Sequence, residues 1–198
     1  FAELREGDVV LGRIRMRPGE EGLLVDLQAR GVRMLPSATA QLCSRSKVLQ
    51  ARILGEFMGP DTLAVHDRND LLESLARLRD RRGLVCKLDR GNGGSGVFRF
   101  STVEDVYTLA MLGQLPFPFV LQPLYSNSRD IRVVILGEAV DAYQRENPNN
   151  FRHNLHCGGR SRPWAMDGNL LALCRKIMAR AGFPYAHLDF LVSESGDY

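Results

Sequence analysis

Short apolar runs separated by amphipathic segments set the pattern of the first part of the chain. Residues 8–15 alternate between polar and apolar positions, which predicts a β-strand. Leucines at helical spacing follow and end before Gly31, and residues 32–35 again favour a strand. A strand–helix–strand order is typical of a parallel α/β layer. Residues 1–43 are therefore predicted to form part of such a layer.

Residues 44–118 mix short strands with helices that are apolar on one side. Thr102, followed three residues later by Asp105, has the pattern of a capping box, in which side chains satisfy the first N–H groups of a helix. Asn69 or Asp70 is expected to cap the preceding helix. The predicted helices span residues 46–57, 71–78 and 102–112, and the predicted strands span residues 62–65, 84–88 and 97–100.

Residues 119–198 open with three apolar runs in close succession, which predict an antiparallel meander. A later helix, capped by Asp167 or Asn169, is expected to end at Gly182. The predicted strands span residues 119–123, 133–136, 139–144 and 185–192. The order of elements predicts an α+β (α/β) chain in three parts, residues 1–43, 44–118 and 119–198.

The composition is that of a globular chain with an ordinary core. Of 198 residues, 44% are hydrophobic, and 26 basic against 23 acidic side chains give a formal net charge of +3. This excess is too small to indicate nucleic-acid binding, and no apolar run has the length of a membrane span. Four scattered cysteines without a C-x-x-C pair favour reduced thiols in a cytoplasmic protein, and a homo-oligomer is compatible with this composition. Because Phe1 is not an initiator methionine and the sequence stops at Tyr198 in an unfinished strand, we expect a piece of a longer protein.

Residues 84–100 place Lys87 before a glycine-rich loop that joins two predicted strands. Gly91, Gly93 and Gly96 spell G-x-G-x-x-G, but a strand follows where a dinucleotide-binding fold needs a helix. In Walker A and protein-kinase motifs the lysine lies after the first glycines, not before them. A glycine-rich hairpin with one solvent-reaching lysine is one interpretation. We favour a loop that covers phosphates with its N–H groups, because four glycines in six residues make the loop entropically costly to order, which a purely structural hairpin does not need.

Three further places combine charge with apolar strands. Asp130 lies just before one predicted strand, Arg145 directly follows the next, and the segment of residues 145–162 is rich in hydrogen-bond donors. That segment fits the wall of an anion site or a long solvated loop equally well. Asp189 lies within an apolar run, where a carboxylate is costly unless it is paired, metal-bound or exposed at a strand end. We favour a metal ligand.

In order and spacing, these residues together resemble the ATP-grasp ligases, most strongly the RimK-like branch, the α-L-glutamate ligases. The resemblance covers residues 44–198 and implies an ATP-grasp fold, in which two α+β lobes clasp ATP after a partial α/β segment. Its motifs are Lys87 with the glycine loop, Gln122-Pro123, Asp130-Ile131-Arg132, Phe151-Arg152-His153-Asn154-Leu155-His156-Cys157-Gly158-Gly159 and Leu188-Asp189.

The resemblance implies a role for each candidate residue. Those at the adenine hinge and the ribose would be Gln122, Pro123, Leu124 and Asp130. Those at the phosphates would be Lys47, Lys87, Gly93, Gly94, Ser95 and Gly96. Those at the transferred phosphoryl group would be Arg145, Arg152 and Asn154. Asp189 would bind Mg²⁺, or Mn²⁺ in its place, with a Glu-x-Asn motif that in such ligases falls beyond the position of Tyr198.

The implied activity is that of an ATP-dependent carboxylate–amine ligase, which forms an amide, ADP and phosphate through an acyl phosphate. Its partners would be ATP, a carboxylate substrate and an amine acceptor, with glutamate-like ligation to a peptide or small molecule. Pro123, His153 and Cys157 depart from the usual residues of the branch, and Ser46 stands where the branch has aspartate. These departures bear on the substrate more than on ATP. The alternatives are a catalytically silent ATP-binding regulatory module and a small-molecule kinase.

Overall fold

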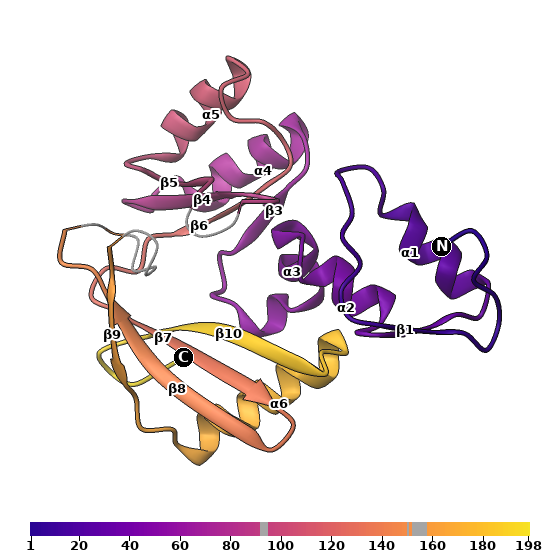
Figure 1. Cartoon of the computed structure of the whole chain (residues 1–198). Coiled ribbons are helices and arrows are strands. Elements are labelled where there is room, and N and C mark those ends of the chain that lie inside the picture. Colours follow the sequence, from indigo (N-terminus) through magenta and orange to yellow (C-terminus); the bar gives the residue numbers. More distant parts are fainter. Residues whose placement is uncertain (92–94, 150, 152–157) are drawn as a thin grey trace.

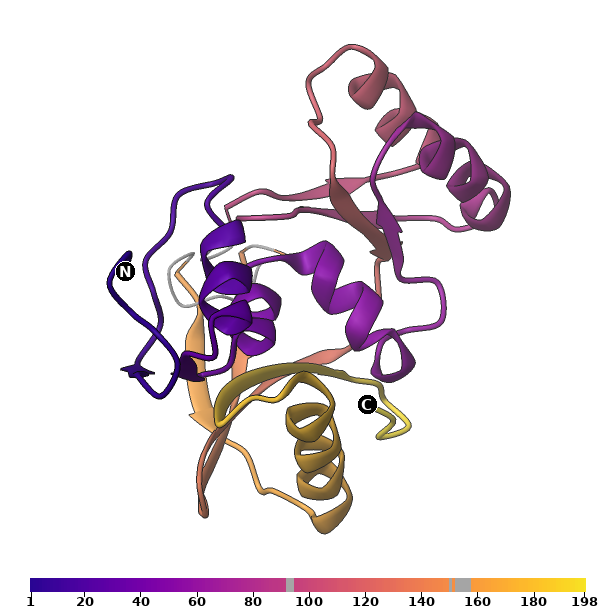
Figure 2. The same ribbon diagram turned by 90° about the vertical axis from the view of Figure 1, so that its right-hand side faces the viewer.

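The computed structural model describes residues 1–91, 95–149, 151 and 158–198, arranged as an N-terminal segment and two lobes (Figures 1 and 2). In the N-terminal segment two short strands pair in parallel, with Val10 opposite Met34, as the strand–helix–strand pattern predicted. Its small core gathers around the fully buried Leu24 and Leu27. The elements of this segment are β1 (Val9–Leu11), α1 (Gly22–Ala29), β2 (Arg33–Leu35) and α2 (Ala38–Cys43).

The first lobe is an antiparallel sheet with two helices on one face (Figure 1). The buried side chains of the sheet form one core with those of the helices. In sheet order the strands are β3 (Leu63–Val65), β6 (Phe119–Pro123), β4 (Leu84–Leu88) and β5 (Val97–Phe100), and the helices are α4 (Arg68–Leu78) and α5 (Val103–Met111).

The sheet topology corrects the predicted boundary after residue 118. Strand β6 was assigned to the last part of the chain, but it pairs with β3 on one side and with β4 on the other. Phe119 and Leu121, both fully buried, complete the core of the first lobe. The first lobe therefore extends to Pro123.

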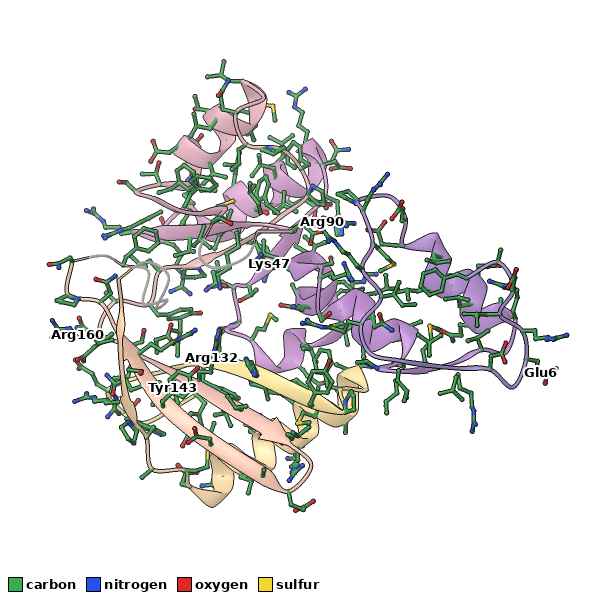
Figure 3. All side chains as sticks on the ribbon, in the orientation of Figure 1. Glu6, Lys47, Arg90, Arg132, Tyr143 and Arg160 are labelled. Carbon is green, nitrogen blue, oxygen red and sulfur yellow. The ribbon has the colours of Figure 1, made fainter. Side chains whose placement is uncertain are left out.

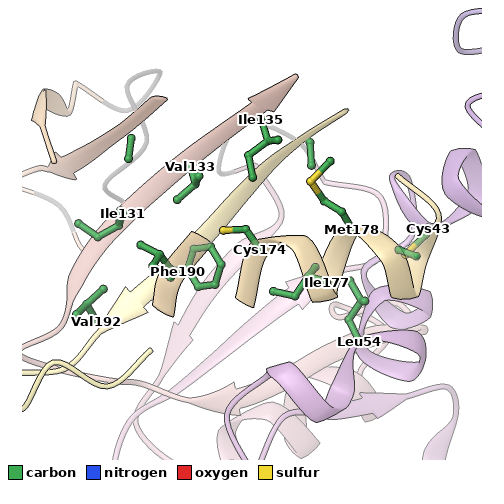
Figure 4. Close-up of a cluster of buried hydrophobic side chains, with 14 residues drawn as sticks. Cys43, Leu54, Ile131, Val133, Ile135, Cys174, Ile177, Met178, Phe190 and Val192 are labelled. Carbon is green, nitrogen blue, oxygen red and sulfur yellow. The ribbon is translucent and has the colours of Figure 1, made fainter. Parts of the chain in front are cut away.

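The second lobe is an antiparallel sheet packed against one long helix (Figure 4). Ile131, Val133 and Ile135 alternate onto the helix-facing side of the sheet, as the period of a strand requires. Cys43 at the end of α2 and Leu54 just after residues 47–53 join the same core, so one residue predicted for the N-terminal part and one predicted for the first lobe pack on the second lobe. The elements are α3 (Lys47–Ile53), η1 (Gly55–Phe57), β7 (Arg129–Leu136), β8 (Ala139–Glu146), β9 (Arg160–Pro163), α6 (Gly168–Ala181) and β10 (Tyr185–Val192).

Strand register decides which side chains share the other face of this sheet. Asp189 on β10 lies opposite Arg132 on β7, and Arg132 lies opposite Tyr143 on β8. Asp130 lies opposite Arg145 in the same way. Directly opposed residues share a face, and alternate residues of β7 pack on the helix. These five side chains therefore lie on the face away from α6, where Figure 3 shows Arg132 turned toward the first lobe.

Helix ends agree with the sequence at most positions. Ser46 caps α3, Asp167 caps α6, and Gly182, with a left-handed backbone at φ 68°, ends α6. Helix α4 is the exception, because Asp67 caps it instead of Asn69 or Asp70. The Asp67 carboxylate accepts hydrogen bonds from the N–H groups of both residues, at 2.7 and 3.0 Å. Among the helices in the part of the chain described, none is long and apolar enough to cross a membrane.

The predicted capping box at the start of α5 is confirmed and offers a test of local stability. The Asp105 N–H donates to Thr102 Oγ1 at 3.2 Å, and the Thr102 N–H donates to Asp105 Oδ2 at 2.9 Å. Thr102→Ala removes one acceptor and should lower the free energy of unfolding by about 1 kcal/mol. Urea denaturation measures this change, and Ser101→Ala, just outside the box, is the control. Equal effects of both substitutions would contradict the prediction.

Candidate functional site

A cleft of about 1190 Å³ lies between the two lobes and extends to the N-terminal segment. It brings together residues that are far apart in sequence and that come from α3, β4, β6 and β10. Four of the predicted site residues line it, namely Lys47, Lys87, Gln122 and Asp189. The fold thus assembles a lysine pair, part of the predicted hinge and the predicted metal ligand around one space.

Lys87 projects from β4 into this cleft as an uncompensated cation. Among the residues that the structure describes, its ammonium forms neither a hydrogen bond nor a salt bridge. Burial lowers the pKa of Lys87, while the negative charges of Asp189 and Asp130 across the cleft act to raise it. Since an enclosed cation without an anion is costly, this position suits a negatively charged ligand.

Lys47 lies beside the glycine loop and is held by its backbone. Its ammonium donates a hydrogen bond to the Leu88 carbonyl at 3.1 Å and another to the Gly91 carbonyl. Burial lowers the pKa of Lys47, Asp89 acts to raise it, and Lys87 acts to lower it further. The lysines of the whole sequence are Lys47, Lys87 and Lys176, so two of the three line the cleft.

The two described ends of the glycine loop, residues 88–91 and 95–96, lie close together, and we call them the loop neck. The Leu88 N–H donates to the Gly96 carbonyl at 2.8 Å. A Cβ at Gly91 would lie 2.2 Å from the Ser95 carbonyl oxygen, and Gly96 has a φ of +71°, so side chains are excluded at both positions. Ser95 and Gly96 thus belong to the neck, whereas the predicted phosphate ligands Gly93 and Gly94 lie outside the described residues.

Two arginines and two carboxylates form a network on the cleft face of the second lobe. Arg145 Nε donates to Asp130 Oδ1 at 2.7 Å, and Arg145 Nη2 lies 3.2 Å from Asp189 Oδ1. Arg132 donates to both oxygens of Asp189, at 2.7 and 2.8 Å. Burial alone would raise the pKa of Asp189, but the hydrogen bonds from Arg132 and the charge of Arg145 hold it below its usual value.

Arg145 therefore acts first as a bridge between carboxylates. Its side chain is only 4% exposed and contacts Asp130 and Asp189 at once. Sequence reasoning placed Arg145 at the transferred phosphoryl group and Asp130 near the ribose, and both roles stay predictions. Sequence reasoning also gave no role to Arg132, although the period of a strand puts it on the face of Asp130. That spacing was the signal that could have identified it.

The side chains around Asp189 could hold a metal ion only if a bound phosphate compound supplied further oxygen ligands. No group of three metal-ligating side chains is found within residues 1–91, 95–149, 151 and 158–198. Mg²⁺ usually takes one or two carboxylates together with phosphate oxygens and waters. The carboxylates of Asp130 and Asp189 are of the right chemical type, and both are held by arginines. Asp189 therefore stays a predicted ligand of a metal ion, for which phosphate oxygens and waters would supply the remaining ligands.

The residues predicted to contact adenine, Gln122 to Leu124, do not all face the cleft. Gln122 lines the cleft, and Pro123 is buried in β6 opposite Leu84. Leu124 instead lines a second pocket of about 760 Å³, and its N–H donates to the Gly83 carbonyl at 2.9 Å. Contact of Pro123 and Leu124 with adenine thus stays a prediction. Arg152 and Asn154 lie outside the described residues.

Comparison with known proteins identifies the family of this chain. Residues 44–198 match the model of the RimK-like ATP-grasp domain. The chain belongs to the RimK-like ATP-grasp family. The predicted resemblance is therefore confirmed.

Two curated relatives and one solved structure add to this finding. A glutathione synthetase of Agrobacterium fabrum is 31% identical over 150 residues, which cover 70% of this chain and 44% of that protein. A probable alpha-L-glutamate ligase of Rhodopirellula baltica is 28% identical over 160 residues, or 77% of this chain and 39% of that protein. The chain thus spans less than half the length of either relative.

The solved structure supports the fold. It is an ADP complex of N5-carboxyaminoimidazole ribonucleotide synthetase, with a TM-score of 0.67 at 14% identity, over 96% of this chain and 51% of that one. The mixed helices and strands of this chain thus form the ATP-grasp fold, as the sequence predicted.

Proposed function

We propose that this chain binds ATP and catalyses the ligation of a carboxylate to an amine through an acyl phosphate. The observation that carries the proposal is the cleft, whose lining includes both the unpaired ammonium of Lys87 and the arginine-held carboxylate of Asp189, while the charge of Asp130 also acts on Lys87. A site with separate cationic and anionic walls suits a phosphate chain with its metal ion. That the structural neighbour was solved as an ADP complex supports a nucleotide as the ligand of this fold.

The residues of the chain would act mainly by position and charge. Lys87 would neutralise a phosphate, and the N–H groups at the loop neck would face the same anion. A carboxylate oxygen of the substrate would attack the γ-phosphorus while the bond to the ADP oxygen breaks. The amine would then attack the acyl carbon, phosphate would leave, and the amine proton would pass to solvent. A Mg²⁺ ion bound beside Asp189 would supply charge neutralisation to the phosphates.

Amino acids or peptides are the substrates that we favour. The names of the two relatives, a glutathione synthetase and a probable alpha-L-glutamate ligase, support this class. We also propose the cytoplasm as the location of the protein. Three cysteines, Cys43, Cys86 and Cys174, are buried free thiols, and burial raises their pKa values to about 11, 12 and 11. Thiols of this kind are stable in a reducing compartment.

An ADP-release assay with paired substrates tests the proposed activity. The protein that carries this chain is incubated with ATP and Mg²⁺ and with panels of carboxylates and amines, separately and together. ADP should accumulate, and amide should form, only when both substrates are present. Hydroxylamine in place of the amine should trap the acyl phosphate as a hydroxamate. ATP binding without turnover would indicate a silent module, and a phosphorylated alcohol would indicate a kinase.

A further inference from the structure

Asp89 is a buried carboxylate beside the cleft residue Lys47, and the proposed function assigns it no role. It follows the last residue of β4 and is only 9% exposed. Its Oδ1 accepts hydrogen bonds from Ser46 Oγ at 2.7 Å and from the Val48 N–H at 3.0 Å. Its carbonyl accepts a third from the Lys47 N–H at 3.2 Å. A single residue of the loop neck therefore holds three consecutive residues at the start of α3.

The contact between α3 and the loop neck runs in both directions. Asp89 accepts hydrogen bonds from α3, while the Lys47 ammonium on α3 donates to the carbonyls of Leu88 and Gly91, on either side of Asp89. Ser46 Oγ also accepts from the Leu49 N–H at 3.1 Å, so the hydroxyl that caps α3 is the one that donates to Asp89. Lys47 is thus fixed through its backbone and through its ammonium.

The charges around Lys47 explain why a carboxylate is needed at this point. Lys47 is enclosed beside a second cation, Lys87, and burial and Lys87 both lower the pKa of Lys47. Asp89 is the nearby group that opposes this shift. An acceptor without charge would keep the hydrogen bonds of Asp89 but would not favour the protonated form of Lys47.

The neighbouring Arg90 fastens the same neck to the N-terminal segment. Arg90 forms an ion pair with Glu21 at the start of α1, and its Nε lies 3.8 Å from Asp89 Oδ2. Figure 3 shows Lys47 and Arg90 near the junction of the first lobe with the N-terminal segment. The charged groups that face Lys47 and Asp89 are therefore Lys87 and Arg90, and Glu21 compensates Arg90.

We propose that Asp89 is a positioning residue for phosphate binding. Through Ser46 and Val48 it fixes the start of α3, so that the Lys47 ammonium is held, protonated, at the neck of the glycine loop. The proposal rests on the proposed function in one respect, which is that the phosphates of ATP lie beside this neck. Asp89 itself does not line the cleft.

The test compares three variants by calorimetric titration with ATP and Mg²⁺. Asp89→Asn keeps an oxygen for Ser46 and Val48 but removes the charge. A second variant, Asp89→Ser with Ser46→Asp, moves the carboxylate to the other end of the same hydrogen bond. Asp80→Asn, an exposed aspartate of the first lobe, is the control. Asp89→Asn should weaken ATP binding about tenfold, as expected for the loss of one charge-assisted contact. The exchanged pair should recover most of that loss, and the control should bind like the unaltered protein.

The pH dependence of ATP binding separates positioning from a merely structural role. The protonated lysine binds phosphate, so its contribution is present below the pKa of Lys47 and is lost as the pH rises through it. Because Asp89→Asn lowers this pKa further, its affinity should begin to fall at a lower pH than that of the unaltered protein.

Each outcome decides the proposal. Unchanged affinity in Asp89→Asn, an unshifted pH profile with weakened binding, or failure of the exchanged pair would overturn it. If the unaltered protein binds ATP but ligates nothing, the proposed activity fails while the positioning role is still measured. If the unaltered protein does not bind ATP, both are wrong.

Discussion

Replacing Lys87 with methionine should weaken ATP binding by roughly 10- to 100-fold, since a hydrogen bond to a charged group contributes about 1.5–3 kcal/mol. Methionine keeps an unbranched stem of similar length in the cleft and removes only the charge. Calorimetric titration with ATP and Mg²⁺ measures the change. Lys176→Met, on the exposed side of α6, is the matched control and should bind ATP normally.

The same substitution should not destabilise the protein without nucleotide. Lys87 forms no salt bridge with any described residue, and burial lowers its pKa. Its enclosed charge therefore destabilises the folded protein when no nucleotide is bound. The free energy of unfolding in urea should therefore stay the same or increase. A Lys87→Met protein that is less stable and binds ATP normally would show that the lysine is structural and would contradict its assignment to a phosphate.

Local structure was the part of the fold most readily predicted from the sequence. The capping box of Thr102 and Asp105, the left-handed Gly182 and the alternation along β7 all follow from interactions within a few residues. The error at α4 has a local cause as well. Asp67, Asn69 and Asp70 all have the side-chain chemistry of a cap, and only the backbone conformation selects Asp67, at φ −151°.

The assignment of elements to lobes depends on contacts distant in sequence. The apolar run Phe119–Pro123 predicts a buried strand but does not indicate which sheet it joins. Only its pairing with β3 and β4 places it in the first lobe. Leu54 likewise has the spacing of a helix core residue, but that spacing does not show that its core belongs to the second lobe. Periodicity identifies an apolar face and leaves its partner open.

The sequence indicated which residue types belong to the candidate site better than it indicated which residues contact one another. Only three of the 26 basic residues are lysines, and this scarcity could have drawn attention to Lys47 and Lys87 before any motif was considered. Asp89 gave no such signal, because its partner Ser46 lies 43 positions away. The bridge made by Arg145 was also hidden, since it depends on the register of β7, β8 and β10.

Replacing Arg145 with leucine should cost about 3–5 kcal/mol of the free energy of unfolding, the range found when one partner of a buried ion pair is removed. Arg145 is 4% exposed and its partner Asp130 is 14% exposed, so the substitution removes from an enclosed carboxylate a guanidinium that donates to it and compensates its charge. Asp189 is affected less, because Arg132 still donates to both of its oxygens. Urea denaturation measures the loss.

Two further variants show whether burial of the pair is the cause. Arg175→Leu removes a cation whose partner Glu138 is fully exposed, and it should change stability far less than Arg145→Leu. Arg145→Leu with Asp130→Leu removes both charges and should recover most of the lost stability, because apolar replacement of a whole buried pair is often neutral. This double variant should nevertheless lose ligase turnover, since Asp189 is no longer held by two arginines. A stable double variant with normal turnover would show that the network serves folding alone. A decrease of under about 1 kcal/mol in the free energy of unfolding of Arg145→Leu would show that the pair behaves like an exposed one.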